Sequence, residues 1–241
     1  MIRLYKKEAQ AYGEFNLGEI IENKPIGFPS DGGKLKPYSN IFYWAHAKAL
    51  TESTIGLHPH KGFEIITIVL EGFIQHYDTS IDRWIGLEKG DIQVIQAGWG
   101  ISHSEKLHKD SSIFQIWFDP DLSISLGKKP KYRDYHDVNF LVNTKGQNKI
   151  KRFDEGINLD SESIEIYEWN IKENQKISLD LKKTHSFYVR SGLFKINEIS
   201  YSTNDFMIIE QESEIQIKIQ EDTIIFGISS PKKPSYTTYG S

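Results

Sequence analysis

The chain contains no cysteine and only two methionines among its 241 residues. Without cysteine it has no disulfide bonds, thiolate metal ligands or thiol nucleophile, so imidazoles and carboxylates must hold any metal ion. No apolar run approaches the roughly eighteen residues that span a bilayer, and the N-terminus lacks the apolar core of a signal peptide. We therefore expect a soluble, intracellular and cytoplasmic protein without a membrane partner.

The chain also lacks a large excess of charge of either sign. The 29 basic and 33 acidic residues are interspersed and leave a formal net charge of −4. A basic stripe that could follow a phosphate backbone is missing, so we expect no direct binding of nucleic acid.

Segments typical of β-strands recur at short and even spacing. They are rich in β-branched and aromatic residues, and glycine-containing turns separate them. This pattern predicts an all-β fold, either an antiparallel barrel or a sandwich. The clearest segments are 41–47, 62–70, 73–79, 92–95 and 111–118.

The stretch from Asp119 to about Tyr135 has few apolar residues and no clear period, which is typical of a connection between domains. We place the boundary at residue 130, with domains 1–130 and 131–241. The second half repeats the arrangement of strand, glycine and strand around Gly192 that the first half has around Gly72. The second half therefore resembles a copy of the first half with a less clear pattern.

Two short motifs carry the chemistry, His58-Pro59-His60 and His103-Ser104-Glu105. Residues two apart on a strand point to the same side, so each motif directs two potential metal ligands at one place. Three imidazoles and a carboxylate suit Fe, Mn, Cu, Ni or Zn better than Ca or Mg. If the register continues past the proline, Glu64 lies on the same face as His58 and His60.

The other histidines are weaker candidates for metal ligands. His76 and Asp78 share a strand face, which we expect to be the solvated side of a hairpin, with a place beside the metal ligands as the alternative. The second half offers His185 alone as a candidate ligand, and a single imidazole does not hold a transition metal. We therefore expect one metal site in the chain.

The sequence around both motifs closely resembles the pirin family of the cupin superfamily. The family pattern is H-P-H-[KR]-G-F-E, then G-D-[VI]-Q, then A-G-x-G-[IV]-x-H-S-E. The matching segments here are 58–64, 90–93 and 97–105.

This resemblance implies a bicupin, in which two antiparallel β-barrels of the double-stranded β-helix type follow one another. The barrel of residues 1–130 would hold the metal, and that of residues 131–241 would be degenerate and without metal. The family's ligands fall on His58, His60, His103 and Glu105. The resemblance leaves Glu64 beside the ligands or in the pocket wall. We expect one divalent metal ion, with Fe(II) first and Mn, Ni, Cu, Co or Zn as alternatives.

Two functions follow from the resemblance. The first is a quercetin 2,3-dioxygenase, an oxidoreductase that opens a small aromatic substrate with O₂. Glu105 is then our first choice for the catalytic base and Glu64 the second. The second is a metal-binding regulatory protein without enzymatic activity, whose metal site tunes a surface for a protein partner.

Overall fold

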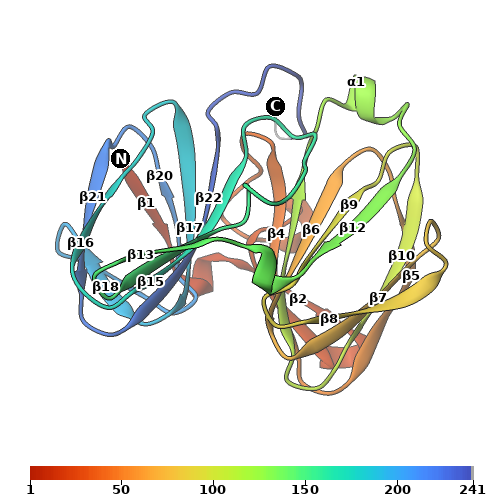
Figure 1. The fold of residues 1–241 in the computed structure, drawn as a ribbon, viewed down its shortest axis with the longest axis horizontal. Helices are drawn as coiled ribbons and strands as arrows, with labels where there is room; N and C mark the ends of the chain where they lie inside the picture. The colour runs from red at the N-terminus through yellow and green to blue at the C-terminus, as the bar shows by residue number, and fades with distance from the viewer. Residues whose placement is uncertain (240–241) are drawn as a thin grey trace. The chain divides into compact units, whose positions relative to one another are not determined.

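The computed structural model describes residues 1–239, which form two compact units of antiparallel strands (Figure 1). The first barrel consists of residues 10–139, 158–162 and 234 onwards. The second barrel consists of residues 1–9, 140–157 and 163–233.

The first barrel has a seven-stranded sheet facing a four-stranded one. In spatial order the large sheet contains β12 (Lys131–Tyr135), β9 (Ile92–Gln96), β6 (Glu64–Glu71), β11 (Ser112–Phe118), β4 (Ile41–Ala49), β3 (Ile20–Ile26) and β2 (Ala11–Phe15). The small sheet contains β5 (Ser53–His60), β10 (Ile101–Leu107), β7 (Phe73–Asp78) and β8 (Arg83–Glu88).

The second barrel repeats this arrangement strand for strand. Its large sheet contains β1 (Ile2–Tyr5), β20 (Phe206–Ile209), β17 (Lys183–Ser191), β22 (Thr223–Pro231), β15 (Glu165–Ile171), β14 (Asn148–Arg152) and β13 (Val142–Lys145). Its small sheet contains β16 (Gln175–Ser178), β21 (Glu214–Ile219), β18 (Leu193–Ile196) and β19 (Ile199–Ser202).

Helices in the described part of the chain are short. They are α1 (Leu122–Ser125) and the 3₁₀ turns η1 (Lys7–Ala9), η2 (Asn16–Gly18), η3 (Pro29–Asp31) and η4 (Asp137–Asn139). Among residues 1–239, none is long and apolar enough to cross a membrane.

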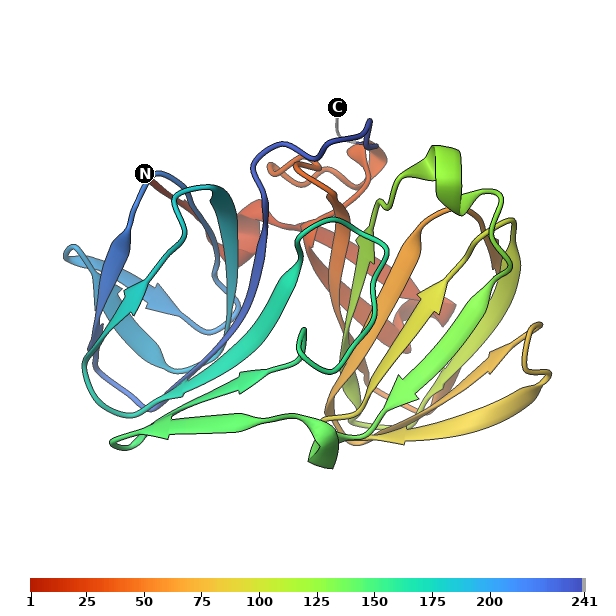
Figure 2. The same ribbon diagram turned by 45° about the horizontal axis from the view of Figure 1, so that its top comes forward.

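The outermost strand of each large sheet explains why the units differ from a division at residue 130. The chain's first strand, β1, pairs with β20 and so belongs to the second barrel, while β12 lies past residue 130 but pairs with β9 in the first (Figure 2). Both pairings cover an edge strand whose backbone groups would otherwise lack partners. Local sequence patterns do not report such long-range pairings.

Alternation along the strands decides which side chains enter the first barrel. On β6, Ile65 and Val69 belong to apolar clusters of the interior, and Thr67 between them contacts Glu105 of β10. The inward face of β11 carries Ile113 and, two residues later, Gln115. The interior thus combines apolar clusters with a polar region around Thr67 and Gln115, where polar side chains from both sheets meet.

Candidate metal centre

Three histidines converge inside the first barrel. In the pairing of β5 with β10, His58 lies opposite His103, and His60 follows two residues after His58 on the same strand. The Nε2 atom of His103 is 2.9 Å from Nε2 of His60 and 2.9 Å from Nε2 of His58. The expected convergence of these imidazoles is therefore present.

The protonation of His60 and His103 leaves their nitrogens free to bind a metal ion. Burial, together with the neighbouring imidazoles, lowers the pKa of His60 to about 3 and that of His103 to about 2. Both rings are therefore neutral at pH 7. The Nδ1 of His58 lies 2.8 Å from the Gly56 carbonyl oxygen, to which it donates when Nε2 carries the lone pair.

The spacing of the three nitrogens fits a shared metal ion. Nitrogen ligands about 2.1 Å from one ion and at right angles to one another lie about 3.0 Å apart. The observed 2.9 Å agrees with this separation. Neutral imidazoles suit divalent transition metals, so the residues fit the kind of ion that the motifs predicted.

Glu105 lies next to this cluster on β10, two residues beyond His103 and on the same face of the strand. Its carboxylate accepts hydrogen bonds from Nε2 of Gln115 at 2.8 and 2.9 Å. Ligand atoms of Glu105, His103 and His76 all lie within 4.8 Å of one another. Glu105 thus belongs to a second group that shares His103 with the three-histidine cluster.

His76 and Asp78 correct the expectation of a solvated hairpin face, because both side chains are fully buried. His76 lies opposite Glu105 in the pairing of β7 with β10, and its Nε2 is 3.0 Å from Oδ2 of Asp78. Its ring also stacks on Tyr132. Alternation along the strand could have revealed this burial, since His76 and Asp78 lie on the same face of β7 as the buried Ile74.

Several hydrogen bonds hold the Asp78 carboxylate in this position. Its Oδ1 accepts hydrogen bonds from the backbone N–H groups of Ser80 and Ile81 and from the Ser80 hydroxyl. Burial raises the pKa of Asp78, but these bonds and the one with His76 outweigh it and lower the pKa to about 2. The carboxylate is therefore ionised and fixes the orientation of the His76 ring.

The expected register from His58 through Glu64 does not hold. Gly62 separates β5 from β6 and has a φ of +90°, a left-handed conformation that interrupts the extended strand and that glycine adopts most readily. On β6, Glu64 and the inward-facing Thr67 are an odd number of residues apart, so they lie on opposite faces. Glu64 therefore points away from His60 and the metal cluster.

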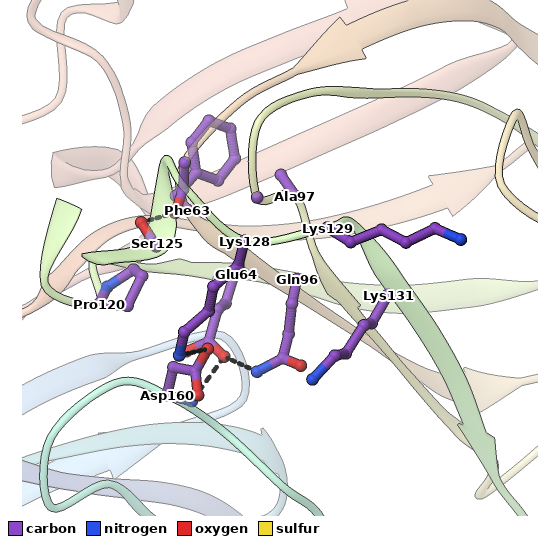
Figure 3. Close-up of a pocket in the computed structure, with 12 residues that line it drawn as sticks. Phe63, Glu64, Gln96, Ala97, Pro120, Ser125, Lys128, Lys129, Lys131 and Asp160 are labelled. Atoms are coloured by element: carbon purple, nitrogen blue, oxygen red, sulfur yellow. Dashed lines mark hydrogen bonds and ion pairs between the residues drawn. The ribbon is translucent and has the colours of Figure 1, made fainter. Parts of the chain in front are cut away.

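The surroundings of Glu64 explain its burial (Figure 3). Its carboxylate accepts hydrogen bonds from Gln96 Nε2 at 2.8 Å and from the backbone N–H groups of Asp160 at 2.7 Å and Ser161 at 2.8 Å. Burial raises its pKa even though these bonds oppose the shift. The choice of Glu64 as second catalytic base is corrected accordingly, because its carboxylate anchors the segment 158–162 to β6.

Two cavities border the cluster. One, of about 350 Å³, contains His58, Glu105 and Gln115 in its wall. The other, of about 950 Å³, contains His60, Phe63 and Trp117 together with residues 235–239. Trp117 is part of both walls. Volumes of this size accommodate a small organic molecule beside the imidazoles.

The second barrel can be aligned with the first through its turns. Gly72 and Gly192 both have positive φ, and the second residue after each, Ile74 or Phe194, faces the interior. Ile74 pairs with Leu107 on β10, and Phe194 pairs with Ile219 on β21. Leu107 and Ile219 are therefore equivalent positions.

At the positions equivalent to the histidine cluster, the second barrel carries apolar residues. Counting back from Ile219, Ile217 corresponds to Glu105 and Ile215 to His103. Ile215 pairs with Ile177, as His103 pairs with His58, and Leu179 then stands for His60. All four belong to the buried core.

His185 lies elsewhere in the second barrel. Its Nδ1 is 2.8 Å from the Ser229 hydroxyl, and its Nε2 is 3.0 Å from the Asp180 carbonyl oxygen. Both groups of three potential ligands found among residues 1–239 lie in the first barrel, and neither includes His185.

The comparisons with known proteins agree with this geometry. The family profile named Pirin matches residues 6–118. The putative quercetin 2,3-dioxygenase PA1210 of Pseudomonas aeruginosa is 30% identical over 77% of this chain and 81% of the relative. The quercetin 2,3-dioxygenase of Escherichia coli K12 is 27% identical over 73% of this chain and 76% of the relative.

Among solved structures, the bacterial pirin YhhW of Escherichia coli in complex with nickel(II) superposes with a TM-score of 0.80 at 23% identity. The superposition covers 96% of this chain and 99% of that one. The superposition shows that the two proteins have the same fold, and the sequence matches show the family. This chain belongs to the pirin family of bicupins.

Proposed function

We propose that the protein is a pirin-type dioxygenase that opens flavonols such as quercetin with O₂. In this proposal His58, His60, His103 and Glu105 hold one divalent transition metal ion, Fe(II) first among the candidates. The observation that carries the proposal is that Nε2 of His103 lies 2.9 Å from Nε2 of both His58 and His60, beside a cavity large enough for an aromatic substrate. The names of the relatives support the choice of substrate class.

A metal ion bound there would supply Lewis acidity to substrate oxygens and a redox-active centre for O₂. The chain's own groups do the rest. Glu105 accepts the proton of the flavonol's 3-hydroxyl group, and Gln115 holds the carboxylate in place for this transfer. The aromatic walls, including Trp117, exclude water from the substrate.

In the same proposal, the second barrel carries no metal ion. Isoleucine and leucine replace the imidazoles and the carboxylate at the equivalent positions, and apolar side chains offer no ligand atoms. Its contribution is then structural.

The test combines elemental analysis of the purified protein with O₂ consumption in the presence of quercetin. We expect about one divalent metal ion per chain and quercetin-dependent O₂ uptake, and His103→Ala should lose both. His108→Ala is the matched control, because His108 lies outside both groups of potential ligands. A fully metallated protein that consumes no O₂ with any flavonol would refute the dioxygenase and favour the regulatory function.

A further inference from the structure

The 350 Å³ cavity beside His58 and Glu105 has a second polar region. It is formed by Glu22 and Lys24 on β3 and by Tyr43 on β4. Glu22 and Lys24 are 6% and 8% exposed, which is unusual for charged side chains. A buried carboxylate and ammonium group in the wall of a cavity incur a desolvation cost that a polar ligand can offset.

The hydrogen bonds within this region leave capacity for a ligand. The Tyr43 hydroxyl donates to Oε1 of Glu22 at 3.2 Å. The Lys24 ammonium donates to Asp31 at 2.9 Å but lies 3.7 Å from Oε2 of Glu22. An ammonium group has three N–H donors and a carboxylate accepts about four hydrogen bonds, so both groups can bind a further partner.

The two polar regions are separated along the sheet. Gln115, which holds Glu105, lies on β11, β4 is its neighbour, and Glu22 lies on β3 beyond that. Two strand spacings amount to about 10 Å. An elongated molecule can span this spacing, from the Glu105 carboxylate that Gln115 holds to Glu22 on β3.

The wall between the two regions is apolar and largely aromatic. The rings of Phe28 and Trp117 meet edge to face at 5.6 Å, and Trp117 stacks on Tyr43 at 4.4 Å. Ile55 and Ile113 complete this part of the wall. Flat rings pack well against such a surface.

We propose that Glu22 and Lys24 bind the phenolic hydroxyl groups at the end of the substrate remote from the metal, and so select flavonols that carry two adjacent hydroxyls on that ring. Glu22 accepts a hydrogen bond from one hydroxyl, and Lys24 donates to the oxygen of its neighbour. This inference rests on the proposed function, because it assumes that the other end of the substrate lies at His58 and Glu105.

The experiment compares quercetin, kaempferol and galangin, which carry two, one and no hydroxyl groups on the remote ring. Steady-state O₂ uptake by the metal-loaded full chain gives kcat and KM for each. We expect the KM for quercetin to be about tenfold lower than that for galangin. Lys24→Met and Glu22→Gln should abolish this preference, so that the KM values for quercetin and galangin become similar.

The matched control is Lys48→Met, since Lys48 is exposed on β4 and is not part of the cavity wall. Each variant is used only when its metal content and Tm match those of the unchanged protein. If a β3 variant does not fold, Tyr43→Phe replaces it, because it removes the donor to Glu22 and should weaken the preference in the same direction. Variants that keep the wild-type ratio of KM values would overturn the proposal.

Failure of this inference can be distinguished from failure of the proposed function. If the unchanged protein consumes no O₂ with any of the three compounds, the dioxygenase proposal fails. Quenching of tryptophan fluorescence then still gives the Kd of each compound, and tighter binding of quercetin that depends on Lys24 supports the polar region. Equal Kd values for all three compounds would refute it even in an active enzyme.

Discussion

The side-chain amide of Gln115 donates hydrogen bonds to both carboxylate oxygens of Glu105, at 2.8 and 2.9 Å. The orientation of this amide is itself fixed, because its Oε1 accepts a hydrogen bond from the indole N–H of Trp117 at 3.2 Å. A row of side chains on β11 therefore determines where the Glu105 carboxylate lies. Groups that orient metal ligands or bases in this way typically matter almost as much as the ligands.

Gln115→Leu should accordingly reduce metal affinity or turnover by about 10- to 100-fold. Leucine keeps the volume but removes the amide that orients Glu105. Metal titration and quercetin-dependent O₂ uptake measure the two effects. Gln96→Leu serves as control, because Gln96 donates to Glu64 instead of to Glu105, and a loss of equal size in that variant would contradict the assigned role of Gln115.

Glu105 belongs to the second motif and Glu64 follows the first motif closely, and both carboxylates are buried. Substitution of Glu64 should affect stability, whereas substitution of Glu105 should affect the metal site. Glu64→Gln should leave metal content unchanged and lower the free energy of unfolding by about 1–3 kcal/mol. The backbone N–H groups of Asp160 and Ser161 would then donate to a neutral and less complete acceptor. Denaturant unfolding and elemental analysis distinguish the effects, and loss of metal in Glu64→Gln would contradict a purely structural role of Glu64.

The metal stoichiometry tests the proposed difference between the barrels. We expect about one ion per chain, unchanged in His185→Ala, because both nitrogens of His185 face groups of its own barrel. His103→Ala should reduce the stoichiometry to zero. A value near two per chain, or a decrease in His185→Ala, would show a second site.

The parts of the site that the sequence reveals are those with strong local patterns. Two motifs with a spacing of two residues on adjacent strands were sufficient to predict that His58, His60 and His103 converge, and the turns at Gly72 and Gly192 indicated the duplication. The position of Glu64 could not be derived in the same way, because the φ of +90° at Gly62 breaks the alternation between β5 and β6.

His76 illustrates a second limit of sequence patterns. Phe73 and Tyr77 of β7 are partly exposed, whereas His76 and Asp78 are buried, so polarity along this strand is the reverse of the usual alternation. Polar residues face inward here because the barrel interior contains the imidazole cluster. Glu22 and Lys24 are buried at a cavity wall for a comparable reason. Such reversals become visible only when the opposite strands are known.

The pH dependence of stability should reveal the buried Asp78. Its pKa of about 2 lies below the value of about 3.9 in an unfolded chain, so the folded protein stabilises the ionised form of this side chain. The resulting stabilisation, about 2 kcal/mol, is fully present above the unfolded pKa and is lost as the pH falls through the folded pKa. The window of interest is therefore pH 5 to pH 2.

Asp78→Asn removes this titration, since an amide carries no charge at any of these pH values. The difference in the free energy of unfolding between the two proteins therefore reports the charge of Asp78, together with its effect on the pKa of the neighbouring His103. We expect this difference, measured by urea unfolding, to be largest near pH 6 and to shrink towards pH 2. A difference that stays constant across this range would mean that the hydrogen bonds from Ser80 and His76 do not depend on the charge of Asp78.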